Sequence, residues 1–234
     1  MSDEFDFDKY WLRVFSMCLD DEVGEKTRDE ILLGSDKFSS ETDRNAVFQW
    51  TKEALAKLDS FVDEKTKKKI MTGCACQYPR ARLQHLKKLY AETKDLILVH
   101  QKMQEEFENF LGETLKLEDK YKEEIIKRNM GQAGVLEEKK IIATKIPKSA
   151  FIKDWFEESV PVKKRAIYCH CPRIRGAMDN LDNELPMYHC YCGAGFYKGI
   201  WEEILQKPVE VEVLETVMNE GEVCKIAIIL PENI

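Results

Sequence analysis

Hydrophobic side chains recur at three- and four-residue steps through the first half of the chain. Few Gly or Pro residues interrupt this spacing from Phe5 to about Lys116, so it predicts about four or five amphipathic helices. The first is expected near Phe7 to Leu19. A second should begin at Ser40, where a Ser-x-x-Asp pattern with Asp43 resembles a capping box. The apolar faces of these helices should meet in a shared core.

Two further helical patterns follow. One runs from Arg80 through Leu111, and a shorter one runs from Lys120 to Asn129. The shorter pattern ends before Gly131 and Gly134, and glycine favours the end of a helix. The apolar positions of both stretches are expected to belong to the core rather than to a cofactor site.

Beyond residue 130 the sequence favours strands as well as helices. The stretch VLEEKKIIATKIP has the β-branched content of a strand or hairpin, and Lys164 to Cys169 predicts a further strand. A helix is expected over Gly195 to Gln206. The stretches VEVEVLETVM and VCKIAIIL predict two strands joined by a turn at Asn219 to Glu222, and the alternation of Val and Glu in the first indicates one buried face.

Together these patterns predict an α+β fold. Residues 1–130 should form a helical region, and residues 131–234 a mixed α and β region with an antiparallel sheet covered by helices. The chain of 234 residues exceeds the usual single-domain size of about 100 to 200 residues. We therefore expect one compact body in which the helical half packs against the mixed half.

Composition and charge narrow the class of protein. The net charge of −7 disfavours a broad nucleic-acid surface, because phosphate binding needs an excess of Lys and Arg on one face. The N-terminal residues MSDEFDFDKYW are acidic and lack the apolar run of a secretory signal, and no stretch approaches the roughly 18 apolar residues of a membrane span. We expect a cytoplasmic protein with reduced cysteines that binds neither nucleic acid nor membranes.

Three Cys-x-Cys pairs carry the most specific chemical signal. Of the 8 cysteines, six fall into this spacing: Cys74 and Cys76, Cys169 and Cys171, and Cys190 and Cys192. In an extended segment residues i and i+2 project from the same face, so each pair can direct two thiolates at one centre. Without an export signal, such a cysteine pattern favours metal or thiol chemistry over disulfides.

The second and third pairs form the expected primary metal site. Cys169, Cys171, Cys190 and Cys192 together offer four sulfur ligands to tetrahedral zinc or, alternatively, to an iron–sulfur cluster. His170 and His189 lie beside these pairs and are secondary candidates, either as ligands or as residues that orient a ligand. The simpler alternative makes the cysteines small buried hydrophobes, which is the interpretation we give to Cys18.

A short repeat adds positive charge beside two of the pairs. CACQYPRAR and CHCPRIR both place Pro-Arg-x-Arg after a Cys-x-Cys pair. If the two segments meet, Arg80, Arg82, Arg173 and Arg175 would offset thiolate charge or hold an anionic ligand by bidentate hydrogen bonds. The alternative is that each pairs with Asp or Glu at the surface. A polar loop is the simpler interpretation of Asp179, Asp182 and Glu184, whose spacing misses the calcium-loop pattern.

The end of the chain resembles a known family. GAGFYKGIWEEILQKPVEVEVLETVMNEGEVCKIAIIL, within Cys190 to Leu230, resembles the closing segment of 4-vinyl reductase type domains: a Gly-Phe helix, a strand toward a Glu, a Gly turn and a final Cys. The same stretch resembles the aminothiazoline-carboxylate hydrolase family. The first resemblance implies binding of a small molecule and zinc ligation by Glu215 and Cys224. The sequence departs from that family where Met218 stands near the expected third ligand, and each of the two residues has a purely structural alternative.

Three functions remain open from the sequence. The favoured one is a metal protein, with zinc preferred to iron–sulfur, that binds or senses a small and anionic molecule. The alternatives are a cysteine- or metal-dependent hydrolase and an iron–sulfur redox protein. The sequence assigns no catalytic residue and no oligomeric state.

Overall fold

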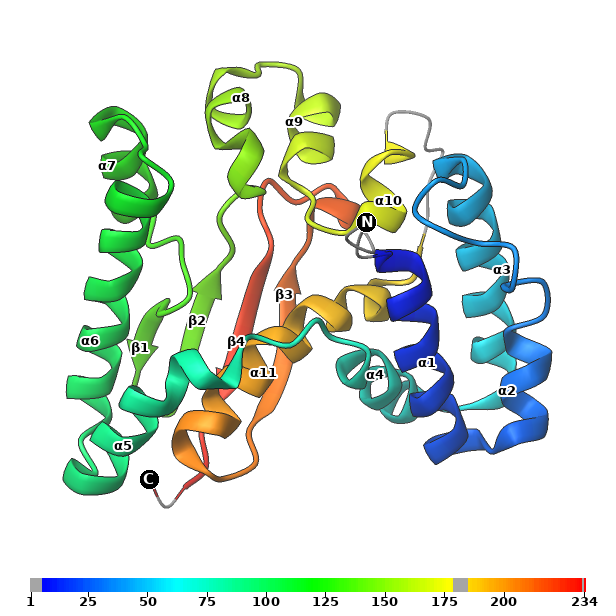
Figure 1. Ribbon diagram of the computed structural model, residues 1–234, viewed down its shortest axis with the longest axis horizontal. Coiled ribbons are helices and arrows are strands. Elements are labelled where there is room, and N and C mark those ends of the chain that lie inside the picture. The colour runs from blue at the N-terminus through cyan, green and yellow to red at the C-terminus, as the bar shows by residue number, and fades with distance from the viewer. Residues whose placement is uncertain (1–5, 179–184, 233) are drawn as a thin grey trace, which may run out of the picture. The chain divides into compact units, whose positions relative to one another are not determined.

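The computed structural model describes residues 6–178, 185–232 and 234 (Figure 1). Contacts divide the chain into two compact units, which are Met1–Cys76 with Cys171–Gly195, and Gln77–His170 with Phe196–Ile234. The expected boundary near residue 130 stays a prediction. Within the described ranges, no helix is both long and apolar enough to cross a lipid bilayer.

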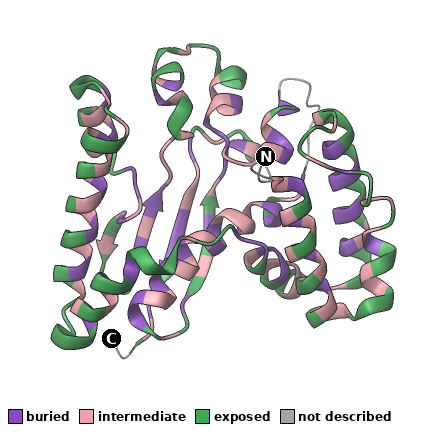
Figure 2. Cartoon of the chain, in the orientation of Figure 1, coloured by how far each residue is buried: buried purple, intermediate pink, exposed green. Residues whose placement is uncertain are grey.

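The first unit is built from helices. Its elements are α1 (Phe7–Val23), α2 (Glu25–Ile31), α3 (Arg44–Phe61), α4 (Glu64–Gly73), α10 (Pro172–Arg175), η5 (Met187–Cys190) and the first turn of α11 (Tyr191–Leu205). Helix α1 packs against α2 and α4, and α3 packs against α2 and α10. Buried positions follow one side of α1 and α3 (Figure 2), and the core of this unit includes Trp11, Phe15, Leu19, Val47 and Leu55.

Aspartates cap helices α1 and α3 of the first unit. Asp6 accepts a hydrogen bond from the backbone N–H of Lys9 at the start of α1, and Asp43 accepts one from Ala46 at the start of α3. Ser40 instead accepts from the backbone N–H of Phe7 and donates to Asp6. The expected cap at Ser40 was therefore wrong, because its hydroxyl binds a carboxylate that is distant in the sequence.

The second unit contains a four-stranded antiparallel sheet in the order β1-β2-β4-β3. Its strands are β1 (Val135–Glu137), β2 (Lys140–Thr144), β3 (Glu210–Glu215) and β4 (Lys225–Ile229). Cross-strand partners place the buried side chains of one face together: Ile141, Ala143, Val213, Ile226 and Ile228. Figure 1 shows α11 crossing the sheet. The α+β class with helices over an antiparallel sheet is confirmed.

The remaining helices of this unit differ from the sequence pattern in two places. They are α5 (Gln84–Thr93), α6 (Leu96–Asn109), α7 (Asp119–Lys127), α8 (Ile152–Glu157) and α9 (Pro161–Tyr168). The single helix expected from Arg80 to Leu111 is broken at Lys94, which adopts a left-handed φ of 54°, and Asp95 then caps α6. The strand expected over Lys164 to Cys169 was wrong, because Pro161 in the first turn begins a helix that ends at Tyr168.

The cap of α6 gives a test of this break. Asp95→Ala should lower the free energy of unfolding by about 1 kcal/mol, because the N–H of Leu98 loses the carboxylate to which it donates. Asp95→Asn keeps a side-chain oxygen there and should retain most of the stability. Urea unfolding followed by far-UV circular dichroism measures both, and equal stability of Asp95→Ala and wild type would contradict this account.

Candidate metal centre

The cysteines are distributed unequally between the two units. All eight lie in the described part of the chain, and none forms a disulfide there. The first unit holds Cys18 and five of the six residues from Cys-x-Cys pairs, namely Cys74, Cys76, Cys171, Cys190 and Cys192. Cys169 belongs to the second unit, where its backbone N–H donates to the carbonyl of Arg165 at the end of α9. The first unit therefore concentrates the thiols.

Cys171 and His189 form a thiol–imidazole pair in the first unit. Cys171 is the residue before α10, and His189 lies in η5. The sulfur of Cys171 lies 3.9 Å from Nε2 of His189. Two ligands of a tetrahedral zinc ion, one sulfur and one nitrogen, stand about 3.5 Å apart, so this pair is close to a ligating separation.

The imidazole of His189 is kept neutral by its surroundings. Its side chain is only 3% exposed, and its Nδ1 has no hydrogen-bond partner among the described residues. Burial and the positive charge of Arg173 lower the pKa of His189 to about 3. A neutral imidazole is the form that binds a metal ion.

Cys190 and Cys192 stand beside this pair along the chain. Both are half-buried, and the thiol of Cys192 donates to the backbone carbonyl of Cys74 at 3.5 Å. Cys76 is exposed. Among the residues that the structure describes, no three His, Cys, Asp or Glu side chains are close enough together to hold a metal ion. Coordination by this segment would therefore require its side chains to move closer together.

Cys18 is not the isolated core residue that the sequence suggested. Its thiol lies within hydrogen-bonding range of the Cys74 thiol, which also donates to the carbonyl of Ile70 at 3.1 Å. The hydrogen bond from Cys74 lowers the pKa of Cys18, whereas burial, reinforced by the contact with Cys18, raises the pKa of Cys74. The separation of 56 positions gave no sequence signal for this pair.

Arg173 is a structural residue rather than an exposed anion-binding one. Its side chain is fully buried, and its guanidinium donates to Asp8 at 2.6 Å and to the hydroxyl of Thr51 at 3.3 Å and 3.2 Å. It also lies over the ring of Trp11 at 4.4 Å. Arg44 donates to the second oxygen of Asp8 at 2.8 Å. These contacts give Arg173 an internal structural role, and its contact with a small anionic ligand stays a prediction.

The other predicted arginines lie in different surroundings. Arg80 and Arg82 are exposed in the short helix η1 (Arg80–Leu83) of the second unit, where Arg80 stands 3.8 Å from Glu203. Arg175 is half-buried in α10 of the first unit. Each copy of Pro-Arg-x-Arg thus forms a short helical turn. His170 belongs to the second unit and places Nε2 2.8 Å from the carbonyl oxygen of Ile146.

Glu215 organises the turn between β3 and β4. Its carboxylate accepts from the backbone N–H groups of Glu222 at 3.1 Å and Val223 at 3.3 Å, and pairs with Lys225 at 2.8 Å. Partial burial alone would raise the pKa of Glu215, but these hydrogen bonds hold it below its usual value. A Cβ at Gly221 would lie 2.7 Å from its side chain, so the close approach requires glycine there.

Cys224 lies next to this turn as a protonated thiol. Burial raises its pKa, although nearby Lys145 and a hydrogen bond from the backbone N–H of Val217 act in the opposite direction. Its own backbone N–H donates to the hydroxyl of Tyr168 at 3.0 Å. The surroundings of Glu215 and Cys224 thus give both residues structural roles, and their ligation of zinc stays a prediction.

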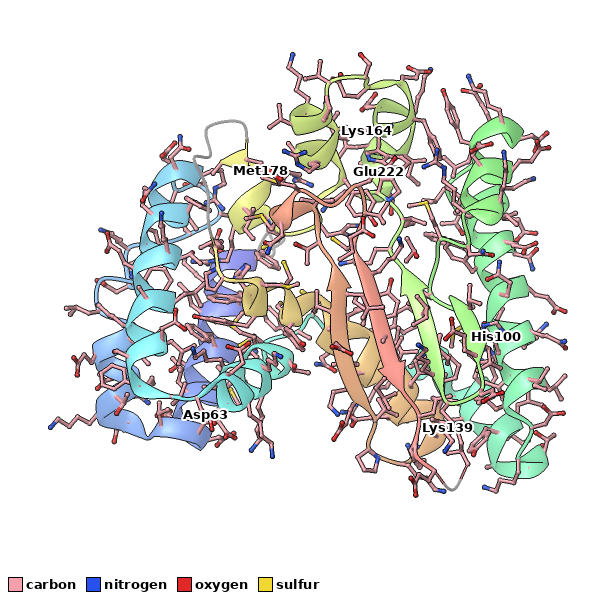
Figure 3. The ribbon with its side chains drawn as sticks, turned by 180° about the vertical axis from the view of Figure 1, so that it is seen from behind. Asp63, His100, Lys139, Lys164, Met178 and Glu222 are labelled. Carbon is pink, nitrogen blue, oxygen red and sulfur yellow. The ribbon has the colours of Figure 1, made fainter. Side chains whose placement is uncertain are left out.

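A shallow cleft of about 290 Å³ lies in the second unit. It is lined by the start of α9 and the turn before β4, with Lys164 and Glu222 contributed by these two elements (Figure 3). Charges of both signs line it, and none of the predicted site residues does. Asp179, Asp182 and Glu184 lie outside the described residues.

The buried ion pair predicts a large effect of removing one partner. Asp8→Asn should lower the free energy of unfolding by about 3–5 kcal/mol, because the guanidinium of Arg173 stays buried without its carboxylate. Glu92→Gln breaks the exposed pair with Lys88 and should cost at most about 1 kcal/mol. Guanidinium chloride unfolding compares the two, and similar losses would contradict the account of Arg173.

His189 predicts a pH dependence of stability in the metal-free protein. The pKa of about 3 in the folded protein lies below the roughly 6.5 of an unfolded chain, so the unfolded state binds more protons as the pH falls between these values. The contribution of the neutral imidazole is complete above about pH 6.5 and is lost toward pH 3. Relative to His189→Asn, wild type should lose about 1.4 kcal/mol per pH unit between pH 6 and 4. Unfolding curves with chelator measure this, and parallel pH profiles would contradict a neutral buried His189.

Comparisons with known proteins found no relative of this chain. No protein-family model, no curated protein and no solved structure matches the chain. The resemblance of Cys190 to Leu230 to 4-vinyl reductase type domains and to aminothiazoline-carboxylate hydrolases therefore stays a prediction.

Proposed function

We propose that this protein is a zinc-binding protein whose first unit holds the metal through Cys171, His189, Cys190 and Cys192. The observation that carries the proposal is the separation of 3.9 Å between the Cys171 sulfur and Nε2 of His189. One thiol and one imidazole already stand near the separation that zinc imposes on two of its ligands. Cys190 and Cys192 lie within three residues of His189 and supply the further thiols.

The sequence predicts four cysteines for this site, whereas the set proposed here contains three cysteines and one histidine. Cys169 lies in the second unit, and His189 takes its place because the imidazole lies against Cys171. A set of three thiolates and one histidine is a common structural zinc set. It is less suited to an iron–sulfur cluster, which is usually held by four cysteines.

The charges around the thiols favour an anionic centre. Arg173 interacts electrostatically with both Cys171 and Cys192. Asp8 carries one negative charge, whereas Arg173 and Arg44 both bind it and carry one positive charge each. The excess positive charge stabilises thiolates, which are the form of cysteine that binds metals. Three thiolates around Zn²⁺ would carry a net charge of about −1, which this excess would balance.

The same charges count against a cysteine-dependent hydrolase built on Cys171 and His189. Such an enzyme needs the imidazole to accept the thiol proton and carry a positive charge. Burial and Arg173 disfavour the charged form of His189. A metal ligand set is therefore better supported than a catalytic pair. The binding of a small anionic molecule stays a prediction, to which the buried Arg173 adds no support.

The proposal is tested by metal analysis of the full chain. Protein purified anaerobically with a thiol reductant should contain roughly one zinc ion per chain and show no colour. Cys171→Ser and His189→Asn should each lose most of this zinc, because each removes one of the proposed ligands. Replacing zinc with cobalt in wild type should produce the visible bands of a tetrahedral thiolate complex.

A matched variant controls for general effects of removing a thiol. Cys18→Ser removes a half-buried thiol of the first unit that lies outside the proposed ligand set, and it should retain the zinc. Zinc that is retained in both Cys171→Ser and His189→Asn would overturn the proposed ligand set. Protein without metal would overturn the function itself, and brown protein with stoichiometric iron would replace zinc with an iron–sulfur centre.

A further inference from the structure

The facing helices α1 and α4 bring two cysteines of the first unit together. Cys18 lies in the interior of α1, and Cys74 is the residue that ends α4. The two helices pack against each other, and the two thiols are within hydrogen-bonding range. The contact joins residues from separate helices, so the pair depends on the folded core of this unit.

Gly73 makes the close approach possible. A Cβ built at Gly73 would lie 2.7 Å from the sulfur of Cys18, closer than any side chain tolerates. The sulfur of Cys18 therefore fills the space that a larger residue would occupy. Cys74 follows directly in the chain, so its thiol is presented to the same place.

The two thiols differ in access to solvent. Cys18 is half-buried, whereas Cys74 has a relative exposure of 0%. A small oxidant can therefore reach Cys18, and Cys74 stands behind it as a second thiol. This is the arrangement of an attacking and a resolving cysteine.

We propose that Cys18 and Cys74 form a reversible disulfide when the protein meets a peroxide. The Cys18 thiolate attacks one peroxide oxygen, the O–O bond breaks, and the second oxygen leaves as water after taking up a proton. The resulting sulfenic acid is attacked by the sulfur of Cys74, so that an S–S bond forms, the S–O bond breaks and a second water leaves. Two thiols and one hydrogen peroxide thus give one disulfide and two waters, and a dithiol reductant reverses the change.

This pair shares no residue with the proposed zinc ligands, although the thiol of Cys192 contacts the backbone carbonyl of Cys74. The thiol of Cys74 faces Cys18 and the carbonyl of Ile70, and neither thiol belongs to the set of Cys171, His189, Cys190 and Cys192. The disulfide does not require the metal. Failure of one proposal therefore leaves the other standing.

The experiment is peptide mapping of the full chain after exposure to peroxide. Reduced wild type is treated with one equivalent of hydrogen peroxide, and the remaining thiols are alkylated under denaturing conditions. Tryptic digestion without reductant should then give a disulfide that links Val14–Lys26 to Ile70–Arg80, which contain Cys18 and Cys74. Cys76 shares the second peptide, so the experiment is repeated with Cys76→Ser, which should give the same link.

Two further variants define the pair. Gly73→Ala keeps both thiols but places a methyl group against the Cys18 sulfur, so the linked fraction should fall several-fold. Cys224→Ser, in the second unit, should leave the link unchanged. Oxidised wild type should also unfold several degrees higher than reduced protein, because the bond closes a long loop of the unfolded chain.

Other outcomes would overturn the inference. Loss of the link in Cys76→Ser would identify Cys76 as the partner of Cys18. If Cys18 is recovered in its alkylated form while other cysteines have been oxidised, peroxide does not react with Cys18. Sulfinic acid at Cys18 without a link would show that Cys74 does not resolve the sulfenic acid.

Discussion

The buried ion pair between Arg173 and Asp8 is the interaction on which the first unit depends. It joins residues 165 positions apart and removes both charges from water, which is costly unless every donor finds an acceptor. The guanidinium donates hydrogen bonds to Thr51 and Asp8, and the ring of Trp11 lies against its face. The pair therefore ties α10 to α1 and α3. Because Cys171 is the residue before α10, the same pair fixes the position of that thiol.

Thiols of one unit acquire different chemistry from their surroundings. Cys171 has a neutral imidazole beside it and the charge of Arg173 nearby, which suits a metal ligand. Cys18 and Cys74 have each other and no such imidazole partner among the residues that the structure describes, which suits reversible oxidation. Spacing in the sequence does not separate these cases, since Cys74 belongs to a Cys-x-Cys pair and Cys18 does not. The two kinds of thiol are distinguished by the residues that they contact on neighbouring helices.

In the second unit, residues near the C-terminus stabilise the ends of the sheet by hydrogen bonds. Glu215 holds the turn before β4 through backbone N–H groups, and Tyr168 accepts from the N–H of Cys224 while its hydroxyl donates to the carbonyl of Lys145. These bonds satisfy backbone groups where the ladder of β2 and β4 ends. Glu215 and Cys224 are the residues for which the resemblance to 4-vinyl reductase type domains implies metal ligation. In the structure they take part in the hydrogen bonds at the ends of the strands.

The sequence by itself determined the α+β class, β structure in the stretch that forms β1 and β2, and the two strands near the C-terminus, because hydrophobic periodicity is a local property of the chain. It also indicated where thiols concentrate. Tertiary structure alone decided that Arg173 is buried against Asp8, that His189 lies against Cys171 and that Cys18 faces Cys74. It also decided the break at Lys94 and the helical state of Lys164 to Tyr168. These outcomes depend on which distant side chain removes a group from water or supplies its hydrogen bond, and no local pattern records that partner.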